Sequence, residues 1–286
     1  MLEFQGAGSQ LPGVYPPGLL PRDAPDGLLN LPTLPAIAMR MLQLVAQEDT
    51  EFFQVLEAVR SDPGCAAELL AMANSPLFAL RGRISTLGQA IIYLGLERAR
   101  STILALVMRS FLQSLGSHPE YRRVWKHSVA TAWIAQALAL KDELEAQDVA
   151  YTTGLLHDLG RLGMLKVYGK KYTQLMAMPH ADAAALREAE QTAFGLTHCE
   201  AGFWLAKTWD IPDTLQLSIL EHHRGPGLSS IACQLANAAG YPCIPYQRPV
   251  AVEDVWNRLN PNTSAWLCRS FGTLQEELRQ HLESFA

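Results

Sequence analysis

The chain of 286 residues is long enough for one large or two modest domains, and its composition excludes several classes of protein. With 49% apolar and 18% charged residues it can form a sizeable core, which excludes wholesale disorder and collagen-like or low-complexity sequences. The formal net charge of −5 and the absence of a basic cluster argue against nucleic-acid binding. No apolar run reaches the roughly 18 residues that span a bilayer, and the first residues lack the pattern of a signal peptide. A cytoplasmic protein without membrane contact is therefore predicted.

The first 30 residues contain five prolines and no helical periodicity, which predicts a loosely ordered leader. From Leu31 onward, apolar residues recur at the i, i+3, i+4 and i+7 spacing of helices buried on one face. This spacing predicts helices over about 34–45, 52–59, 63–73, 87–94 and 97–115. The segment Asp49-Thr50 and the residue Ser85 are the expected caps, Pro63 starts a helix, and Gly95 ends one.

The segment 116–119 is the predicted boundary between two halves. Beyond it, helical patterns run over about 121–140, 146–157, 169–178, 182–193, 198–208, 212–222 and 229–239. Few β-branched residues and no hairpin signal are present, so we predict an all-α fold. It has helical subdomains at 31–116 and 117–240, and a tail at 241–286 with a proline-rich connector (242–249) and a last helix (273–284).

The five cysteines are odd in number and widely spaced, with no CxxC pair, which argues against a disulfide framework or a thiolate zinc knuckle. They are interpreted as small apolar core residues in a reducing compartment. These cysteines are Cys65, Cys199, Cys233, Cys243 and Cys268.

Most of the histidines in the second half stand at the ends of predicted helices. Asp158 stands at the end of an apolar run, and an ionised carboxylate in that position is expensive to bury without a partner. A helical bundle can gather such positions at one end of its core, and imidazole with carboxylate suits Fe, Mn, Zn or Ni. The alternative is that the histidines are ordinary core or surface residues, and that His157 and Asp158 pair with each other or with Arg161. The histidines concerned are His127, His157, His198, His222 and His223.

Two regions resemble the HDOD family, the HD-related output domain of bacterial signalling proteins. The first contains LPTLP at 31–35, SDP at 61–63, LLAMANS at 69–75, ISTLGQAI at 84–91 and LGLER at 94–98. The second contains WKHS at 125–128, GLLHDLG at 154–160, HCEAG at 198–202, WDIP at 209–212 and EHH at 221–223. The resemblance covers about 31–240 and implies an all-α, regulatory protein.

The second region is also similar to the metal-dependent HD phosphohydrolases, including the HD-GYP phosphodiesterases. That similarity implies metal ligands at His127, His157, Asp158, His198, His222 and His223. The last acidic ligand of the group is Asn237 here, the usual lysine is Arg161, and the Gly-Tyr-Pro segment is absent. The amide of Asn237 lacks the negative charge of the acidic ligand, whereas Arg161 keeps the positive charge of the lysine and could hold a phosphate in a different geometry.

Three hypotheses follow from these resemblances. The first is a non-catalytic regulatory module that contacts a kinase, a regulator or another signalling domain, with a mononuclear or dinuclear metal site. The second is a metal-dependent phosphohydrolase for a nucleotide or cyclic dinucleotide, in which Asp158 and Arg161 act in catalysis. The third is a site that binds a nucleotide, another anion or a redox-active gas without turnover. In a longer protein, a receiver domain upstream is the expectation from the family.

Several other residues receive weaker predictions. The six tryptophans are expected in cores or against the tail. Glu188 and Glu190 are expected on a solvated face, while Glu221 could orient a neighbouring imidazole. The lysines at 166, 170 and 171 either lie in solvent or attract an anionic ligand.

Overall fold

The computed structural model describes residues 25–47, 50–75, 83–116, 119–142, 146–224, 227–245 and 251–283, and within them only helices and their connections occur. The fold is all-α, as predicted. The first half contains α1 (Asp26–Leu29), α2 (Ala36–Val45), α3 (Phe52–Arg60), α4 (Pro63–Ala73), α5 (Leu87–Leu94) and α6 (Leu96–Leu115).

The second half contains the helices that surround the histidines. They are α7 (Pro119–Asp142), α8 (Gln147–Leu156), α9 (Leu159–Tyr168), α10 (Lys170–Ala177), α11 (Ala183–Phe194), α12 (His198–Thr208), α13 (Asp213–Glu221) and α14 (Leu228–Ala238). The tail contains α15 (Val252–Trp256) and α16 (Pro261–Glu283). None of the described helices combines the length and the apolar character that crossing a membrane requires.

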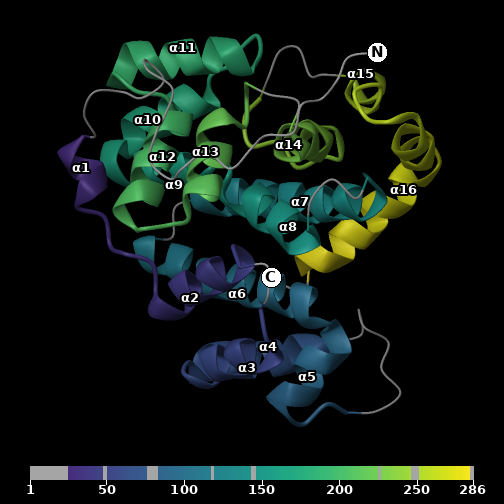
Figure 1. Cartoon of the computed structure of the whole chain (residues 1–286). Helices are drawn as coiled ribbons and strands as arrows, with labels where there is room; N and C mark the ends of the chain where they lie inside the picture. The colour runs from purple at the N-terminus through teal and green to yellow at the C-terminus, as the bar shows by residue number, and fades with distance from the viewer. Residues whose placement is uncertain are drawn as a thin grey trace, which may run out of the picture.

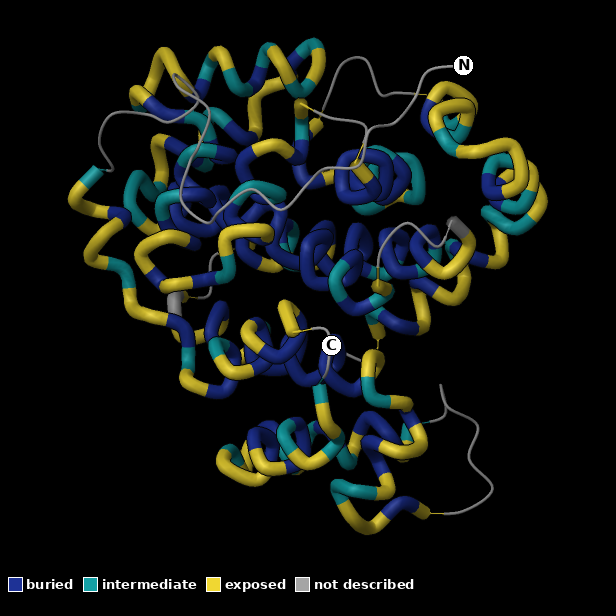
Figure 2. Tube along the Cα trace, in the orientation of Figure 1, coloured by how far each residue is buried: buried dark blue, intermediate teal, exposed yellow. Residues whose placement is uncertain are grey.

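The helices form a larger body and a smaller end (Figure 1). Helices α3, α4 and α5 form the smaller end, and α2 and α6 lie between it and the larger body. Helices α7, α8 and α14 pack together at the centre of the larger body, and α16 lies along α7. Buried residues are concentrated along these central helices (Figure 2). The histidines predicted as ligands therefore lie on helices that are packed from several sides.

Two close helix contacts fix the backbone around these histidines. A side chain at Gly154 would place its Cβ 2.7 Å from the Cα of Ala132, so α8 approaches α7 closely just before His157. A Cβ at Gly160 would lie 1.8 Å from the carbonyl oxygen of His198. Glycine is required at both positions because any larger residue would push neighbouring helices apart.

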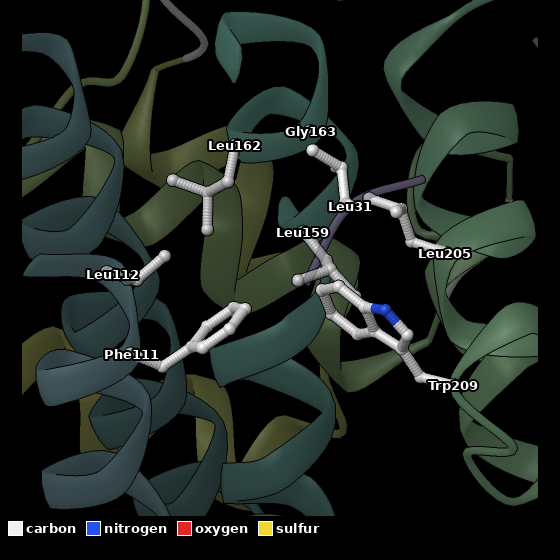
Figure 3. Close-up of a pocket in the computed structure, with 8 residues that line it drawn as sticks. All are labelled: Leu31, Phe111, Leu112, Leu159, Leu162, Gly163, Leu205 and Trp209. Carbon is white, nitrogen blue, oxygen red and sulfur yellow. The ribbon is translucent and has the colours of Figure 1, made fainter. Parts of the chain in front are cut away.

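An apolar seam joins the two halves of the chain (Figure 3). Phe111 and Trp209 meet there edge to face, with ring centroids 5.7 Å apart. The cavity beside them is only about 10 Å³, about the size that holds one water molecule. Its lining residues are Leu31, Phe111, Leu112, Leu159, Leu162, Gly163, Leu205 and Trp209. With this lining, the cavity offers no polar group to a ligand.

One buried apolar cluster runs through the first half and into the second, from Leu28 to Ile244. A second cluster joins α7, α8 and α14 to α15 and α16. Leu28 belongs to the predicted leader, yet its side chain is buried; residues 1–24 lie outside the described residues. The boundary at 116/117 remains a prediction, since residues 117 and 118 also lie outside the described part.

Trp204 belongs to neither apolar cluster, whereas the other five tryptophans pack in or against one of them, as predicted. Trp209 is buried in the first cluster, and Trp133 stacks on His281 of α16 with ring centroids 4.3 Å apart. Trp256 and Trp266 pack against the second cluster.

The helix prediction missed the short helices α1 and α15, and it was wrong in three further places. It omitted α9, because Gly160 and Gly163 weaken the helical pattern and are tolerated only through their close contacts with α12 and α1. It began the last helix at 273, although the side chain of Asn260 accepts hydrogen bonds from the backbone at 262 and 263 and α16 starts at Pro261. It placed a cap at Ser85, whereas Thr86 forms the capping box with Gln89.

Two further predicted features lie at least partly outside the described residues. Asp49 of the expected turn before α3 is one of them, and the N-cap of that helix is Glu51. The connector at 242–249 is described only as far as residue 245.

Candidate functional site

Four imidazoles surround the buried carboxylate of Asp158. The Asp158 Oδ2 atom lies 3.8 Å from His127 Nε2 and 3.6 Å from His157 Nε2. The Oδ1 atom lies 3.7 Å from His198 Nε2 and 3.6 Å from His222 Nε2. These side chains come from α7, the end of α8, the start of α12 and the end of α13, so segments far apart in the sequence converge on one acidic group.

The other ring nitrogen of each of these imidazoles is held by an acceptor. His127 Nδ1 lies 2.8 Å from the Tyr241 carbonyl, and His157 Nδ1 lies 2.7 Å from the Gly154 carbonyl. His222 Nδ1 is 2.7 Å from the Ile219 carbonyl. Each Nδ1 must donate to these oxygens, which leaves the Nε2 atom of each ring facing Asp158. Outer partners of this kind orient histidines for a metal ion.

The fourth imidazole is held by Glu190, which the sequence analysis placed on a solvated face. That prediction was wrong: Glu190 is fully buried, and its Oε2 accepts hydrogen bonds from His198 Nδ1 at 2.6 Å and His198 N at 2.9 Å. Its Oε1 accepts one from the hydroxyl of Tyr172 at 2.7 Å. Burial alone would raise the pKa of Glu190, but the charge and hydrogen bonds of His198 lower it to about 2. Glu188, two residues earlier, is exposed as predicted.

The guanidinium of Arg161 occupies one side of the carboxylate. Its Nε lies 2.8 Å from Asp158 Oδ1, and its Nη2 lies 3.1 Å from His198 Nε2. Against the effect of burial, Arg161 and His157 hold the pKa of Asp158 well below its ordinary value. Asp158 therefore presents two different faces. The Oδ1 face contacts a cation, and the Oδ2 face contacts the imidazoles of His127 and His157.

Three buried cysteines line the same cluster: the thiol of Cys243 faces Asp158, and the other two approach imidazoles. Cys233 Sγ lies 3.5 Å from His127 Nε2, and Cys199 Sγ lies 3.6 Å from His198 Nε2. The interpretation of the cysteines as core filler missed this placement, because none of these thiols stands in a metal-binding spacing along the chain. Cys268 is exposed, which corrects its prediction as a core residue.

The remaining predicted site residues lie at the edge of the cluster. His223 Nε2 is 3.1 Å from His198 Nε2, and its side chain is partly exposed. The Oδ1 atom of Asn237 is buried and accepts no hydrogen bond from the described residues. Glu221 is exposed, so the carboxylate that holds an imidazole is Glu190. The lysines at 166, 170 and 171 are exposed, in keeping with a solvated face.

The donor set fits a transition-metal ion. Among the described residues, three groups of donor atoms lie within 4.8 Å of one another: His198, Cys199, His222 and His223 form the first, His127, His157 and Cys233 the second, and His157, Asp158 and His222 the third. The buried Nε2 of His222 faces Asp158 Oδ1 at 3.6 Å, so it lies among the same donor atoms. Imidazole, carboxylate and thiol together match Zn, Fe or Ni better than Mg or Ca.

The family model for the HDOD domain matches residues 31–225. The chain belongs to the HDOD family. A curated relative, an uncharacterized protein of Treponema pallidum (strain Nichols), is 24% identical over 206 residues, which cover 70% of this chain. The chain spans only 39% of the length of that relative.

Solved structures share the fold. An HDOD domain protein of unknown function from Geobacter sulfurreducens is 25% identical, with a TM-score of 0.71 over 87% of this chain and 92% of its own. A candidate signal transduction protein from Marinobacter aquaeolei VT8 is 23% identical, with a TM-score of 0.74 over 90% and 60% of the two chains. A candidate phosphohydrolase from Shewanella amazonensis SB2B is 20% identical, with a TM-score of 0.64 over 89% and 96%. Since the same fold carries both descriptions, the fold does not decide between them.

Proposed function

We propose that this HDOD chain is a regulatory module of a cytoplasmic signalling system that binds a divalent transition-metal ion and does not hydrolyse phosphoesters. The partner would be a kinase, a regulator or another signalling domain. The observation that carries the proposal is the position of Arg161, whose guanidinium lies against the Oδ1 face of Asp158.

A two-metal hydrolase uses a bridging carboxylate to hold two ions that stabilise the attacking and the leaving oxygen. In this chain, Arg161 Nε already lies 2.8 Å from one oxygen of Asp158. A second ion on that face would meet a fixed positive charge at short range. In addition, Asn237 provides no negative charge at the position of the last acidic ligand. Both features oppose a pair of ions and support one ion at most.

Burial of the cluster also opposes catalysis. Asp158 is 1% exposed, and His157 and His198 are fully buried. A phosphoester must approach the ion and the water that attacks it, and side chains packed this closely offer it no surface. A buried ion instead stabilises the packing of the helices that hold it.

The residues that would hold the ion are His127 and His157, with Asp158 through its Oδ2 atom. When bound there, the ion would supply a fixed positive charge that links α7 to the end of α8. The backbone carbonyl oxygens of Tyr241 and Gly154 already orient the imidazoles of His127 and His157.

Several apolar side chains are exposed at the smaller end of the molecule. Phe53 of α3 is 68% exposed and Ile92 of α5 is 73% exposed, and these two helices pack against each other. Tyr93 is exposed on the same helix as Ile92. Exposed apolar side chains on neighbouring helices are typical of protein contact sites. These features support regulation through protein contact.

The test is to measure metal content and turnover on the same preparation. Purified protein is dialysed with Zn²⁺, Mn²⁺ or Fe²⁺, its bound metal is quantified, and hydrolysis of bis-(p-nitrophenyl) phosphate and of a cyclic dinucleotide is followed. We expect at most one ion per chain and no turnover above a buffer that contains the same metal.

Hydrolysis that disappears in His157→Ala would contradict the proposal and favour the phosphohydrolase hypothesis. The observation that favours this second hypothesis is that the histidines at the implied ligand positions are retained. Binding of a nucleotide without turnover, seen as a rise in the melting temperature, would instead favour the ligand-binding hypothesis.

A further inference from the structure

Helix α14 places a thiol where the cluster has lost an acidic ligand. Cys233 and Asn237 are four residues apart, so they lie one turn apart on the same face of α14. Asn237 stands at the position of the last acidic ligand and is neutral. Cys233 is buried, and its Sγ lies 3.5 Å from His127 Nε2.

The donor atoms of His127, His157 and Cys233 all lie within 4.8 Å of one another. This group is on the side of Asp158 that faces Oδ2, because His127 and His157 both approach that oxygen. The thiol thus lies beside the face of the carboxylate that is turned away from Arg161.

We propose that Cys233 is a metal ligand, and that the thiolate replaces the negative charge that Asn237 does not provide. This inference rests on the metal site of the proposed function and specifies its ligands as His127, His157, Asp158 and Cys233. On binding, the S–H bond of Cys233 is exchanged for a sulfur–metal bond, and the proton passes to solvent.

The charges of this ligand set match a divalent ion. One carboxylate and one thiolate together carry two negative charges, and the two imidazoles are neutral when their Nε2 atoms coordinate the metal ion. Two nitrogens, one oxygen and one sulfur give four donor atoms, the usual number for Zn²⁺, and each of the three donor types is one that Zn²⁺ binds. Thiolate also favours Zn²⁺ over Mn²⁺ or Mg²⁺, which prefer oxygen ligands. The site is therefore selective for a thiophilic ion.

The second thiol makes a useful contrast. Cys199 Sγ lies 3.6 Å from His198 Nε2, but that nitrogen is also 3.1 Å from the Nη2 atom of Arg161. An ion bound by Cys199 would lie close to a guanidinium, which would repel it. Cys199 is consequently expected to stay outside the first coordination sphere.

The experiment uses Co²⁺ as a spectroscopic substitute for Zn²⁺ in the full chain. A cobalt–thiolate bond gives an intense near-ultraviolet charge-transfer band that a site of nitrogen and oxygen ligands lacks, whereas d–d bands report any bound Co²⁺. We expect the charge-transfer band in the native protein and in Cys199→Ser, and its loss in Cys233→Ser. The Zn²⁺ affinity of Cys233→Ser should fall by more than the roughly 10–100-fold that loss of an outer partner causes.

Cys65→Ser is the matched control, because Cys65 is a buried cysteine of α4 in the first half of the chain. It should keep the band and the affinity. Helicity and melting temperature in chelator are compared for all variants, and Cys233→Ala replaces Cys233→Ser if the latter does not fold.

The outcomes separate this inference from the proposed function. Co²⁺ that binds to the native protein with d–d bands but no charge-transfer band would overturn the thiolate ligand and leave the metal site standing. A band that persists in Cys233→Ser and vanishes in Cys199→Ser would also overturn it. A native protein that binds neither Co²⁺ nor Zn²⁺ would overturn both the inference and the metal site.

Discussion

The side chain of Arg161 determines how the cluster around Asp158 is charged. It is a buried cation whose Nε lies 2.8 Å from Asp158 Oδ1 and whose Nη1 lies 3.4 Å from Glu190 Oε1. A cation that is paired with two buried carboxylates is costly to remove, because each carboxylate then loses a partner in a medium of low dielectric constant.

We predict that Arg161→Met changes both the stability and the metal content of the protein. Without the guanidinium, the free energy of unfolding in chelator should fall by about 3–5 kcal/mol. When metal is supplied, the vacated Oδ1 face should accept a second ion beside His198 and His222. Urea denaturation in chelator and metal analysis after dialysis against Zn²⁺ measure the two effects.

Arg60→Met is the control, since Arg60 forms an exposed ion pair with Glu57 in which the two side chains are 57% and 66% exposed. Its free energy of unfolding should change by less than about 1 kcal/mol. An Arg161→Met protein with no more metal than the native protein would show that the guanidinium does not exclude an ion.

At the scale of the helices, the contact between α9 and α12 positions two members of the cluster. Asp158 precedes α9 and His198 begins α12, and Gly160 lies against the first turn of α12. The absence of a side chain at Gly160 is what allows the two helices to meet closely enough for their ends to share one site.

Gly160→Ala should therefore destabilise the protein although alanine is the better helix former. The added Cβ would lie 1.8 Å from the His198 carbonyl oxygen, so backbone must move, and the expected loss exceeds about 3 kcal/mol. Gly272→Ala in α16 adds a Cβ with nothing within 4 Å and should raise the stability by about 0.5–1 kcal/mol. Urea denaturation compares the two variants, and an equal effect at both positions would contradict the argument.

Helix α16 adds a pH-dependent contribution through His281. This side chain stacks on Trp133 of α7, and burial, followed by the charge of Arg98, lowers its pKa to about 3. In the unfolded chain the imidazole keeps its ordinary pKa of about 6.5. As the pH falls below 6.5, the unfolded state takes up a proton that the folded state does not, so stability is complete above 6.5 and is lost toward pH 3.

We predict that the native protein loses about 1.4 kcal/mol more than His281→Phe between pH 7.5 and pH 5.5. The other buried histidines titrate in both proteins, so their contribution cancels in the difference. Urea denaturation at the two pH values in chelator gives the four free energies. An identical pH dependence of the two proteins would mean that His281 protonates freely in the folded state.

At the scale of the whole molecule, the two predicted subdomains share packing and a buried ion pair. Arg100 of α6 pairs with Asp148 of α8, and Arg100 Nη1 also donates to the Leu44 carbonyl at the end of α2, 2.8 Å away. The continuous apolar cluster crosses the same junction. Two halves joined in this way are expected to unfold together.

We predict that the native protein unfolds in a single transition. Asp148→Asn should shift the midpoint of that transition equally for every signal. The substitution leaves the Arg100 cation uncompensated, so the free energy of unfolding should fall by about 3–5 kcal/mol. Tryptophan emission reports on the second half, because every tryptophan lies at position 125 or later, while far-ultraviolet circular dichroism reports on all helices. Both signals should keep a common midpoint. Separate midpoints, in the native protein or the variant, would contradict a shared core.

As a control, Glu276→Gln removes one carboxylate of an exposed pair with Arg279 on α16. It should change the stability far less than Asp148→Asn does and leave the common midpoint in place.

The order of amino acids was sufficient to predict the all-α class, the HDOD family and most of the helices. Helix periodicity and end signals such as Pro63 and Gly95 act over a few residues, so they can be recognised along the chain. The set of histidines around Asp158 was also predicted, because those residue types stood at helix ends in a familiar order.

Glu190, Arg161 and Cys233 show what the order could not reveal. Glu190 has the charge expected of an exposed helix position, and only in the folded chain is it buried against His198. Arg161 lies three residues after Asp158, so this pairing is local and was one of the predicted alternatives, but its contacts with His198 and Glu190 join α9 to other helices. Cys233 is separated from His127 by 106 residues and lies 3.5 Å from it in space. Contacts of this kind arise when helices are packed against one another, and no local pattern records them.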